Sequence, residues 1–133
     1  MDISLCVLNK KTLMLEFSGA NNPLWLLRKN DSEIFEIKPT KQAVGKGDLS
    51  KKFETHQIQL SQGDLIYIFS DGFADQFGGD KGKKYKYKPF KDLIVANRTK
   101  SLQEQNNLIN FEFEKWKQDL EQVDDICVIG VRI

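Results

Sequence analysis

Apolar residues recur at the spacing of β-strands over the first half of the chain. Residues 3–8 and 12–17 are short apolar runs separated by "NKK", which predicts a β-hairpin. Residues 24–29 and 33–38 form a second pair about an "NDS" turn. Each face of 33–38 mixes apolar and charged residues, so we expect this strand at the edge of a sheet.

Two more stretches predict strands before residue 70. "THQIQL" alternates cleanly and places His56, Ile58 and Leu60 on one face, with His56 partly buried. "LIYIF" at 65–69 is nearly continuous in apolar residues, which predicts a strand covered on both faces. Residues 39–53 are rich in glycine and lysine and predict irregular structure.

The second half carries two helical patterns and a last strand. Residues 89–97 predict a short helix with proline in its first turn. A longer helix is predicted over 101–120, where Ser101 and Glu104 fit a capping box. "ICVIGVRI" at 126–133 predicts another buried strand. The longer helix has one apolar stripe at helical spacing, which predicts core packing: Ile109, Phe113, Trp116 and Leu120.

The predicted order is six strands, two helices and one strand. Because the early strands pair as hairpins and the last returns to the sheet, we predict a mixed α/β (α+β) layered fold with mostly antiparallel sheets. A chain of 133 residues is expected to be one domain or a piece of a larger one.

Composition narrows the class of protein. Hydrophobic residues make up 40% and charged residues 29%, as in soluble globular proteins. A net charge of +1 does not support nucleic-acid binding over the whole surface. No apolar run is long enough to cross a membrane and no leader pattern opens the chain, so we expect a cytoplasmic segment without membrane contact. Cys6 and Cys127 lie in apolar runs without C-x-x-C spacing, which predicts reduced core thiols.

Acidic residues mark the ends of two predicted strands. Asp71 closely follows "LIYIF", whereas Asp124 and Asp125 precede "ICVIGVRI". If these strands are antiparallel neighbours, the three carboxylates meet at one edge of the sheet. Two carboxylates about 4 Å apart repel by roughly 4 kcal/mol at an effective dielectric of about 20. Such a cluster therefore favours a bound cation or a protonated acid.

The residue types favour a hard divalent ion over zinc, because the donors are oxygens and no histidine or cysteine ligand set accompanies them. Gly72 allows a tight turn after Asp71, and Asp75 points the same way if "DGFAD" begins a helical turn. An EF-hand loop is excluded, since Phe73 stands at a ligand position and no glutamate closes the loop. Solvated turn acids are the alternative interpretation, because D-G is a common turn dipeptide.

Several stretches, in chain order, carry a resemblance to a known family: "LEFSGANNPLWLLR", "AVGKG", "HQIQLSQGDLIYIFSDG", "GDLIYIFSDGFAD" and "VDDICVIGVRI". Together they resemble the metal-dependent protein phosphatases of the type 2C superfamily (PPM). The bacterial branch typified by the stage II sporulation phosphatase (SpoIIE-like) is the closer match. Each motif alone is weak, but the ordered set covers nearly the whole chain.

This resemblance implies a sandwich of mostly antiparallel sheets flanked by helices. It implies two Mn²⁺ or Mg²⁺ ions per complete domain, which activate water for attack on a phosphoserine or phosphothreonine. Asp71 and Asp124 correspond to metal ligands in that family. Asp75 falls at an acid associated with a further, weaker metal, while Asp125, like Gly72, is expected to support the site. No catalytic residue beyond metal ligands is implied.

The chain departs from the family pattern in its first part. The motif of the form D-x-x-G-H-G, whose aspartate bridges both metals, is absent, and the only histidine is His56. We therefore expect residues 1–133 to be the C-terminal portion of a single phosphatase domain, with Met1 internal to a longer protein. We also expect weak metal binding, little activity from this chain alone, and self-association through exposed apolar surface.

A basic stretch separates the two acidic segments. Residues 81–91 hold six lysines, of which Lys83 and Lys84 are candidates for contacting a phosphorylated partner. The resemblance implies a phosphorylated regulatory protein, of the anti-sigma-factor-antagonist kind, as substrate, and a sensor domain upstream. A solvated loop is the alternative interpretation, and nucleic-acid contact is disfavoured because the stretch is short.

Two other functions stay open on the sequence. One is a non-catalytic partner-binding module derived from the phosphatase fold. The other is a small acidic-cluster metal protein unrelated to phosphatases. Retention of both Asp71 and Asp124 argues against the binding-only alternative, because such a module has no need of acids that repel each other.

Overall fold

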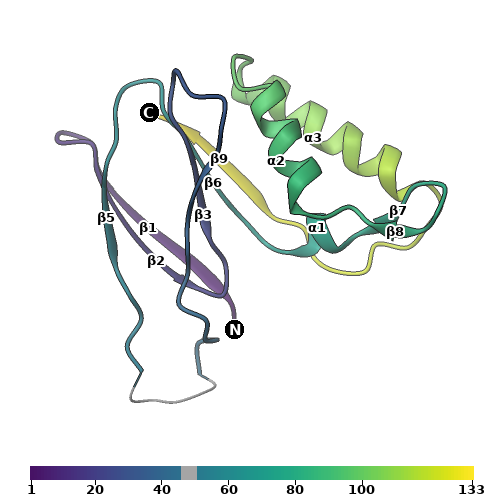
Figure 1. Ribbon diagram of the computed structural model, residues 1–133, viewed down its shortest axis with the longest axis horizontal. Coiled ribbons are helices and arrows are strands. Elements are labelled where there is room, and N and C mark those ends of the chain that lie inside the picture. The colour runs from purple at the N-terminus through teal and green to yellow at the C-terminus, as the bar shows by residue number, and fades with distance from the viewer. Residues whose placement is uncertain (46–50) are drawn as a thin grey trace. The chain divides into compact units, whose positions relative to one another are not determined.

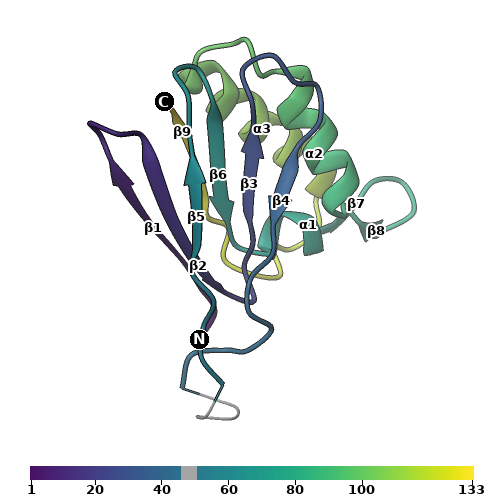
Figure 2. The ribbon, with the colours of Figure 1, turned by 60° about the vertical axis from the view of Figure 1, so that its left-hand side comes forward.

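The computed structural model describes residues 1–45 and 51–133, which form two compact units (Figures 1 and 2). Unit 1 comprises Met1–Phe69 together with Ile129–Ile133, and unit 2 comprises Ser70–Val128. Of the "AVGKG" segment, Lys46 and Gly47 lie outside the described residues, as does the middle of the stretch predicted to be irregular. No helix in the described ranges is both long and apolar enough to cross a membrane.

Two sheets make up unit 1 (Figure 2). The first has the order β1-β2-β5, with β1 (Ile3–Asn9), β2 (Met14–Ala20) and β5 (His56–Gln59). The second has the order β4-β3-β6-β9, with β3 (Leu24–Leu27), β4 (Phe35–Ile37), β6 (Leu65–Phe69) and β9 (Val128–Arg132). Both predicted hairpins are confirmed as antiparallel pairs, β1 with β2 and β3 with β4. The predicted edge position of β4 is confirmed as well.

Strand β6 is buried nearly along its whole length, as its continuous apolar sequence predicts. It lies between β3 and β9, and Trp25 of β3 packs its ring 4.1 Å from that of Phe69. Both sheets contribute to one apolar core, whose fully or nearly buried members are Leu15, Phe17, Leu24, Leu26, Ile37, Leu60 and Ile66. Strand β6 is therefore hydrogen-bonded on both sides within its sheet.

The prediction of a buried last strand is wrong for β9. Ile129 is 48% exposed and Val131 is 37% exposed, and Cys127 just before the strand is exposed too. The physical reason is the strand order, because β9 lies at an edge of its sheet. The prediction of a core thiol is therefore wrong for Cys127. Cys6 is partly buried, and burial raises the pKa of its thiol.

A buried carboxylate ties β3 and β6 together at the start of β6. Asp64 is 2% exposed and accepts hydrogen bonds from Arg28 Nη1 (2.7 Å) and from the N–H groups of Ser61 (2.9 Å) and Lys29 (3.1 Å). Burial acts to raise the pKa of Asp64, but these hydrogen bonds outweigh it and hold the pKa below its ordinary value.

Replacing Asp64 by asparagine is expected to lower the free energy of unfolding at pH 7 by about 1–3 kcal/mol, because a buried acceptor is exchanged for a donor. Since the folded pKa is depressed, the stability from Asp64 is present above the unfolded pKa of about 4 and is lost as the pH falls through the folded value. Urea denaturation from pH 7 to pH 3 measures both effects. The exposed Asp31→Asn variant is the control, and equal losses in the two variants would contradict the assignment.

Unit 2 holds the helices, and in both ribbon views α2 and α3 lie side by side (Figures 1 and 2). Its elements are α1 (Gly72–Asp75), β7 (Phe77–Gly78), β8 (Lys83–Lys84), α2 (Tyr87–Ala96) and α3 (Leu102–Lys117). The predicted capping box is confirmed: Ser101 Oγ accepts from Glu104 N–H, while the Glu104 carboxylate accepts from Ser101 N–H. The hydrogen bonds that the Ser101 hydroxyl (2.7 Å) and the Ser101 N–H donate to the Glu104 carboxylate lower the pKa of Glu104.

The longer helix ends earlier than its apolar stripe predicts. Gln118, directly after α3, has φ of +50°, and a left-handed residue of this kind stops the helical hydrogen-bond ladder. Leu120 therefore lies beyond the helix and is 45% exposed, so its predicted place in the core is wrong. Phe113 is buried as predicted, whereas Ile109 and Trp116 are half-buried.

Four aromatic rings form the core of unit 2. The Phe73 ring stacks on Phe90 at 4.3 Å between centroids, meets Tyr85 edge-on at 5.1 Å, and lies 5.6 Å from Phe113. Phe73 belongs to α1, Phe90 to α2 and Phe113 to α3, so this cluster joins all three helices.

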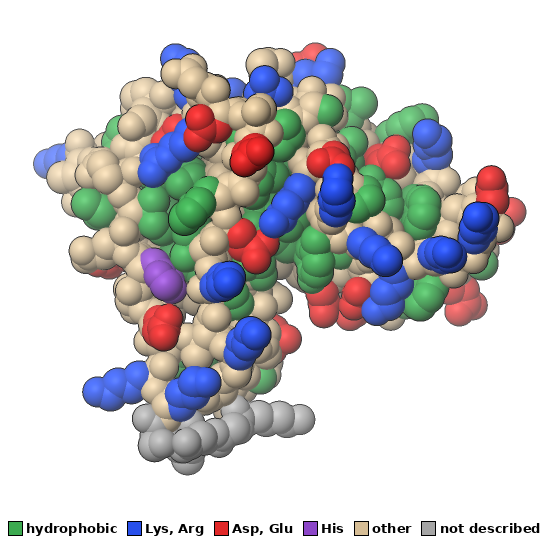
Figure 3. Space-filling view, in the orientation of Figure 1, with side chains coloured by type: hydrophobic (Ala, Val, Ile, Leu, Met, Phe, Trp, Pro, Cys, Tyr) green, Lys and Arg blue, Asp and Glu red, His purple; other side chains and the backbone are tan. Residues whose placement is uncertain are grey.

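The surface is mixed in charge: on the face shown in Figure 3, basic and acidic side chains are interspersed.

Candidate metal centre

The site begins at Asp71, which lies between the last strand residue of β6 and the first residue of α1. Asp71 is the N-cap of α1, yet its side chain makes no capping hydrogen bond. Its main-chain oxygen accepts from Asp75 N–H at 2.9 Å, which closes the helical turn that "DGFAD" predicts. The carboxylate is exposed. The backbone of Asp71 is therefore fixed by the helical turn, and its carboxylate is not used as a helix cap.

Ser70 joins this turn to the segment that carries Asp124 and Asp125. Its N–H donates to the Cys127 carbonyl (2.9 Å), and its hydroxyl donates to the Asp125 carbonyl (2.9 Å). The same hydroxyl accepts from Cys127 N–H at 3.0 Å. Three hydrogen bonds thus fix the backbone immediately before Asp71 against the backbone immediately after Asp124.

Gly72 lets the two segments approach each other closely. A Cβ atom at this position would clash with the carbonyl oxygen of Asp125, and the side chain of Ile126 is next to it. A backbone oxygen cannot move away as the tip of a long side chain can. Gly72 is thus required here for close contact and not for a special turn, because its φ is not positive and it begins a regular helical turn.

Gln76 joins the segments again on the other side of α1. Its side chain is completely buried, and Nε2 donates to the carbonyl oxygens of Glu121 (2.9 Å) and Phe77 (3.0 Å). Its Oε1 accepts from Val123 N–H at 3.3 Å. Every polar atom of this buried amide is therefore used, which is the rule for buried polar groups.

These contacts hold together the two backbone segments that carry the candidate ligands. Contacts from Ser70 reach Cys127, those from Gly72 reach Asp125, and those from Gln76 reach Glu121, so partner numbers fall as residue numbers rise. That is the pattern of two antiparallel segments. Asp71 lies between Ser70 and Gln76 on one segment, and Asp124 lies between Glu121 and Cys127 on the other. The structure thus places Asp71 and Asp124 on two backbone segments in contact with each other, and the expectation that their carboxylates meet stays a prediction.

The carboxylates of Asp71, Asp124 and Asp125 form no ion pair within the described residues. Asp124 Oδ1 accepts from Asp125 N–H at 2.7 Å, which orients the Asp124 side chain. Asp125 contributes chiefly through its backbone, whose carbonyl contacts Ser70 and Gly72. All three side chains belong to exposed residues, so they are accessible to an ion.

Asp75 and Lys84 are paired with each other. Lys84 Nζ lies 3.1 Å from Asp75 Oδ1, with the two side chains 46% and 43% exposed. The same ammonium lies 5.8 Å from the centroid of the Phe77 ring. A lysine ammonium thus stands where a cation would contact Asp75. Lys83, its neighbour in β8, is exposed.

The donor chemistry fits a hard divalent ion only in part. Carboxylate oxygens suit Mg²⁺ or Mn²⁺, and the two acidic segments are held together by the contacts of Ser70, Gly72 and Gln76. However, residues 1–45 and 51–133 contain no group of three or more acidic, histidine or cysteine side chains gathered as a metal site. The described residues therefore provide only part of the ligand set of a metal centre.

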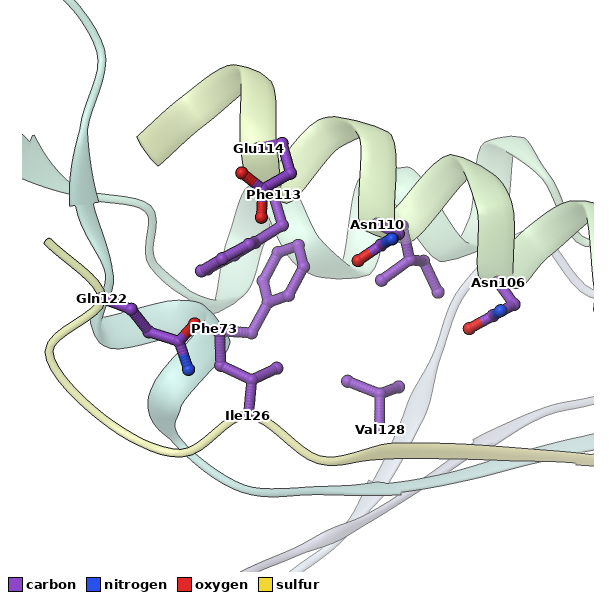
Figure 4. A pocket seen from close by; sticks show the side chains of 9 residues that line it. Phe73, Asn106, Asn110, Phe113, Glu114, Gln122, Ile126 and Val128 are labelled. Carbon is purple, nitrogen blue, oxygen red and sulfur yellow. The ribbon is translucent and has the colours of Figure 1, made fainter. Parts of the chain in front are cut away.

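A separate cavity of about 350 Å³ lies between α3 and the segment that leads into β9 (Figure 4). Phe73, Phe113 and Ile126 give it an apolar side, and Asn106 and Asn110 of α3 give it a polar one. None of the acids Asp71, Asp75, Asp124 or Asp125 lines it. Sequence reasoning missed this cavity, because the asparagines at helical spacing have no motif that distinguishes them from solvent-facing polar residues.

Sequence reasoning also missed Ser70 and Gln76. Ser70 lies directly after β6 within the stretch that the family motif covers, but nothing in its residue type indicates contacts more than fifty positions away. Gln76 reads as an ordinary loop residue between Asp75 and Phe77. Only its complete burial and its bonds to Glu121 and Val123 identify its role.

This chain is similar to known proteins in sequence and in fold. The family model for Stage II sporulation protein E (SpoIIE) matches residues 1–133. Among solved structures, the SiaA-PP2C domain of Pseudomonas aeruginosa is similar with a TM-score of 0.89 and 27% identity over 99% of this chain and 51% of that one. No curated protein sequence matches this chain.

Two structures from Bacillus subtilis share the fold at lower identity. The SpoIIE phosphatase domain presoaked with Mn matches with a TM-score of 0.72 and 20% identity, over 100% of this chain and 56% of that one. The SpoIIE PP2C phosphatase domain with a fragment of its regulatory domain matches with a TM-score of 0.79 and 21% identity, over 99% and 37%. The predicted fold is therefore confirmed as the mixed α/β fold of PP2C phosphatase domains, and this chain spans about half of the SiaA and Mn-presoaked SpoIIE structures.

Proposed function

Because this chain belongs to the Stage II sporulation protein E (SpoIIE) family, whose PP2C-type fold supports a phosphatase function, we propose that it forms part of a metal-dependent protein serine/threonine phosphatase. The reaction is hydrolysis of a phosphoserine or phosphothreonine on a regulatory protein. The chain corresponds in this proposal to the C-terminal portion of a single phosphatase domain.

One observation carries the proposal beyond family membership. Asp71 and Asp124 lie on two segments that Ser70, Gly72 and Gln76 hold in antiparallel contact. Two carboxylates that repel each other are expected to lie on adjoining segments only where an opposite charge stabilises them. Asp71 and Asp124 would hold Mn²⁺ or Mg²⁺, with Asp125 and Gly72 supporting the backbone. Such an ion, when bound, supplies activation of water for attack on phosphorus.

Asp75 has a different role in this proposal from that of Asp71 and Asp124. A third, weaker metal at Asp75 would have to displace Lys84, whose ammonium is 3.1 Å away. Lys83 has no such partner among the described residues and is the better candidate for contacting a phosphorylated substrate. That substrate is proposed to be a phosphorylated regulatory protein of the anti-sigma-factor-antagonist kind, with a sensor domain upstream.

This chain alone is expected to release phosphate from a phosphoserine peptide no faster than MnCl₂ in buffer does. Two ligand-bearing segments without a bridging aspartate give each ion too few protein oxygens to hold the pair in place. Colorimetric phosphate release with and without 1–133 is the measurement. Robust Mn²⁺-dependent turnover by the purified chain would contradict the expectation. No release is expected from a chain carrying both Asp71→Asn and Asp124→Asn, which serves as the matched blank.

A non-catalytic partner-binding module is the second candidate. It is favoured by the fact that fewer than three candidate ligands gather within the described part of the chain. In either case self-association is part of the proposal, because β1 is an edge strand whose Ile3, Leu5 and Val7 are exposed. Absence of Mn²⁺ binding at Asp71 and Asp124, together with binding of a phosphoprotein, would favour the module.

A further inference from the structure

We propose that Gln76 is a positioning residue for the metal ligands, and that its amide sets the affinity of the site for a divalent ion. This inference rests on the proposed function, since it concerns how Asp71 and Asp124 are held. Gln76 follows the turn that begins at Asp71, and it contacts the chain on both sides of residue 122. It reaches the second ligand segment without belonging to it.

The chemistry of the amide suits this task. Nε2 donates to the Glu121 carbonyl, and Oε1 accepts from the N–H of Val123. Val123 directly precedes Asp124. One group must therefore donate and accept at once, which an amide does and an ionised carboxylate or an apolar side chain does not. Gln76 is also 0% exposed, so water does not substitute for either bond.

The main chain of Gln76 is fixed independently of its side chain. Its carbonyl oxygen accepts from Tyr85 N–H (3.0 Å) and from Trp116 Nε1 (3.0 Å). Tyr85 joins the aromatic core of unit 2, and Trp116 belongs to α3. The backbone of Gln76 is thus fixed to the aromatic core and to α3, and its side chain holds segment 121–125.

Ser70 and Gln76 bracket the two ligands between them. Ser70 fixes the backbone after Asp124 through the carbonyls of Asp125 and Cys127, and Gln76 fixes the backbone before it. Segment 121–125 is otherwise exposed and has no helix or strand of its own. Loss of the Gln76 amide therefore frees one side of Asp124 while leaving the other side attached.

The test replaces Gln76 by methionine, which has nearly the same volume and no hydrogen-bonding amide. Hydrogen exchange at Val123 N–H is expected to become about 10-fold faster, as the loss of one buried hydrogen bond predicts. The dissociation constant for Mn²⁺, measured from the electron paramagnetic resonance signal of free Mn²⁺, is expected to rise about 10-fold, the lower end of the range for supporting partners of metal ligands.

Gln105→Met is the matched control. Gln105 is also a buried amide of unit 2, 3% exposed, but it donates to the Lys100 carbonyl at the start of α3. We expect this variant to lose global stability comparably and to keep both the Mn²⁺ affinity and the exchange rate at Val123. If Gln76→Met proves unfolded, Val123→Pro removes the same hydrogen bond from the exposed side, and the same rise in dissociation constant is expected.

The outcomes separate the two claims. Unchanged Mn²⁺ affinity in Gln76→Met, with wild-type binding intact, overturns the role of Gln76 and leaves the proposed function standing. Equal weakening in Gln76→Met and Gln105→Met overturns it too, because the effect would then follow stability. An absence of Mn²⁺ binding by the wild-type chain overturns the ligand assignment itself, and with it this inference.

Discussion

The Asp71→Asn variant is expected to lose the stabilisation that Mn²⁺ gives to the wild-type chain. At a free Mn²⁺ concentration ten times the dissociation constant, a ligand that binds only the folded state adds about 1.4 kcal/mol to the free energy of unfolding. Removing the Asp71 carboxylate removes one of two candidate ligands. Without metal the variant should be at least as stable as the wild type, because one of two repelling carboxylates is gone. Denaturation by urea with and without MnCl₂ measures both effects.

Asp80→Asn is the matched control for this experiment. Asp80 is an exposed acid of the same unit, between β7 and β8. Its replacement changes the net charge by the same amount and should leave the response to Mn²⁺ unchanged. A full Mn²⁺ response in Asp71→Asn would contradict the ligand assignment, and so would an equal loss of response in both variants.

Phe73→Ala is expected to lower the free energy of unfolding of unit 2 by about 3–5 kcal/mol. Phe73 is 1% exposed and contacts three aromatic side chains from α2, α3 and the loop before α2. The truncation leaves a cavity at the point where the three helices meet. Because Phe73 is two residues from Asp71, the same change is expected to disorder the ligand turn. Near-ultraviolet circular dichroism during denaturation follows the loss of aromatic packing.

Phe111→Ala provides the comparison, since Phe111 lies on α3 and is 66% exposed. Its truncation should change the stability by no more than about 0.5 kcal/mol, as is usual for surface positions. If both variants lose similar stability, the aromatic cluster is not the core of unit 2.

Much of the fold follows from local sequence patterns. The apolar runs at residues 3–8 and 12–17, the continuous apolar run of β6 and the capping box at Ser101 each predict an element that the structure contains. These signals are local, because a strand face or a helix cap is specified by residues within a few positions of each other. The coarse order of strands and helices is therefore accessible without a structure.

The errors arise where the environment of a residue depends on distant parts of the chain. The apolar run at β9 is the same kind of sequence as β6, but β9 lies at a sheet edge and β6 lies inside. Leu120 continues the periodicity of α3, yet the backbone turns left-handed at Gln118. Neither the strand order nor that turn is encoded in hydrophobic periodicity.

The candidate site divides in the same way. Asp71 and Asp124 were accessible from the sequence, because acids at strand ends and the family motif both point to them. Their supports, Ser70 and Gln76, were not, since their partners are more than forty positions away in the chain. Similarly, the pairing of Asp75 with Lys84 is a property of the folded chain, and it redirects the interpretation of both residues.

Asp71 and Asp124 are proposed to bind one divalent ion from two chain segments. The most direct test is Mn²⁺ titration of the ¹⁵N-labelled chain, because paramagnetic Mn²⁺ broadens the amide signals of residues near it. We predict that the signals of Asp71, Gly72, Asp124 and Asp125 broaden together at the same Mn²⁺ concentration, before those of other acidic residues. Broadening of only one of the two segments, or first broadening at Asp80 or Asp119, would contradict a shared site.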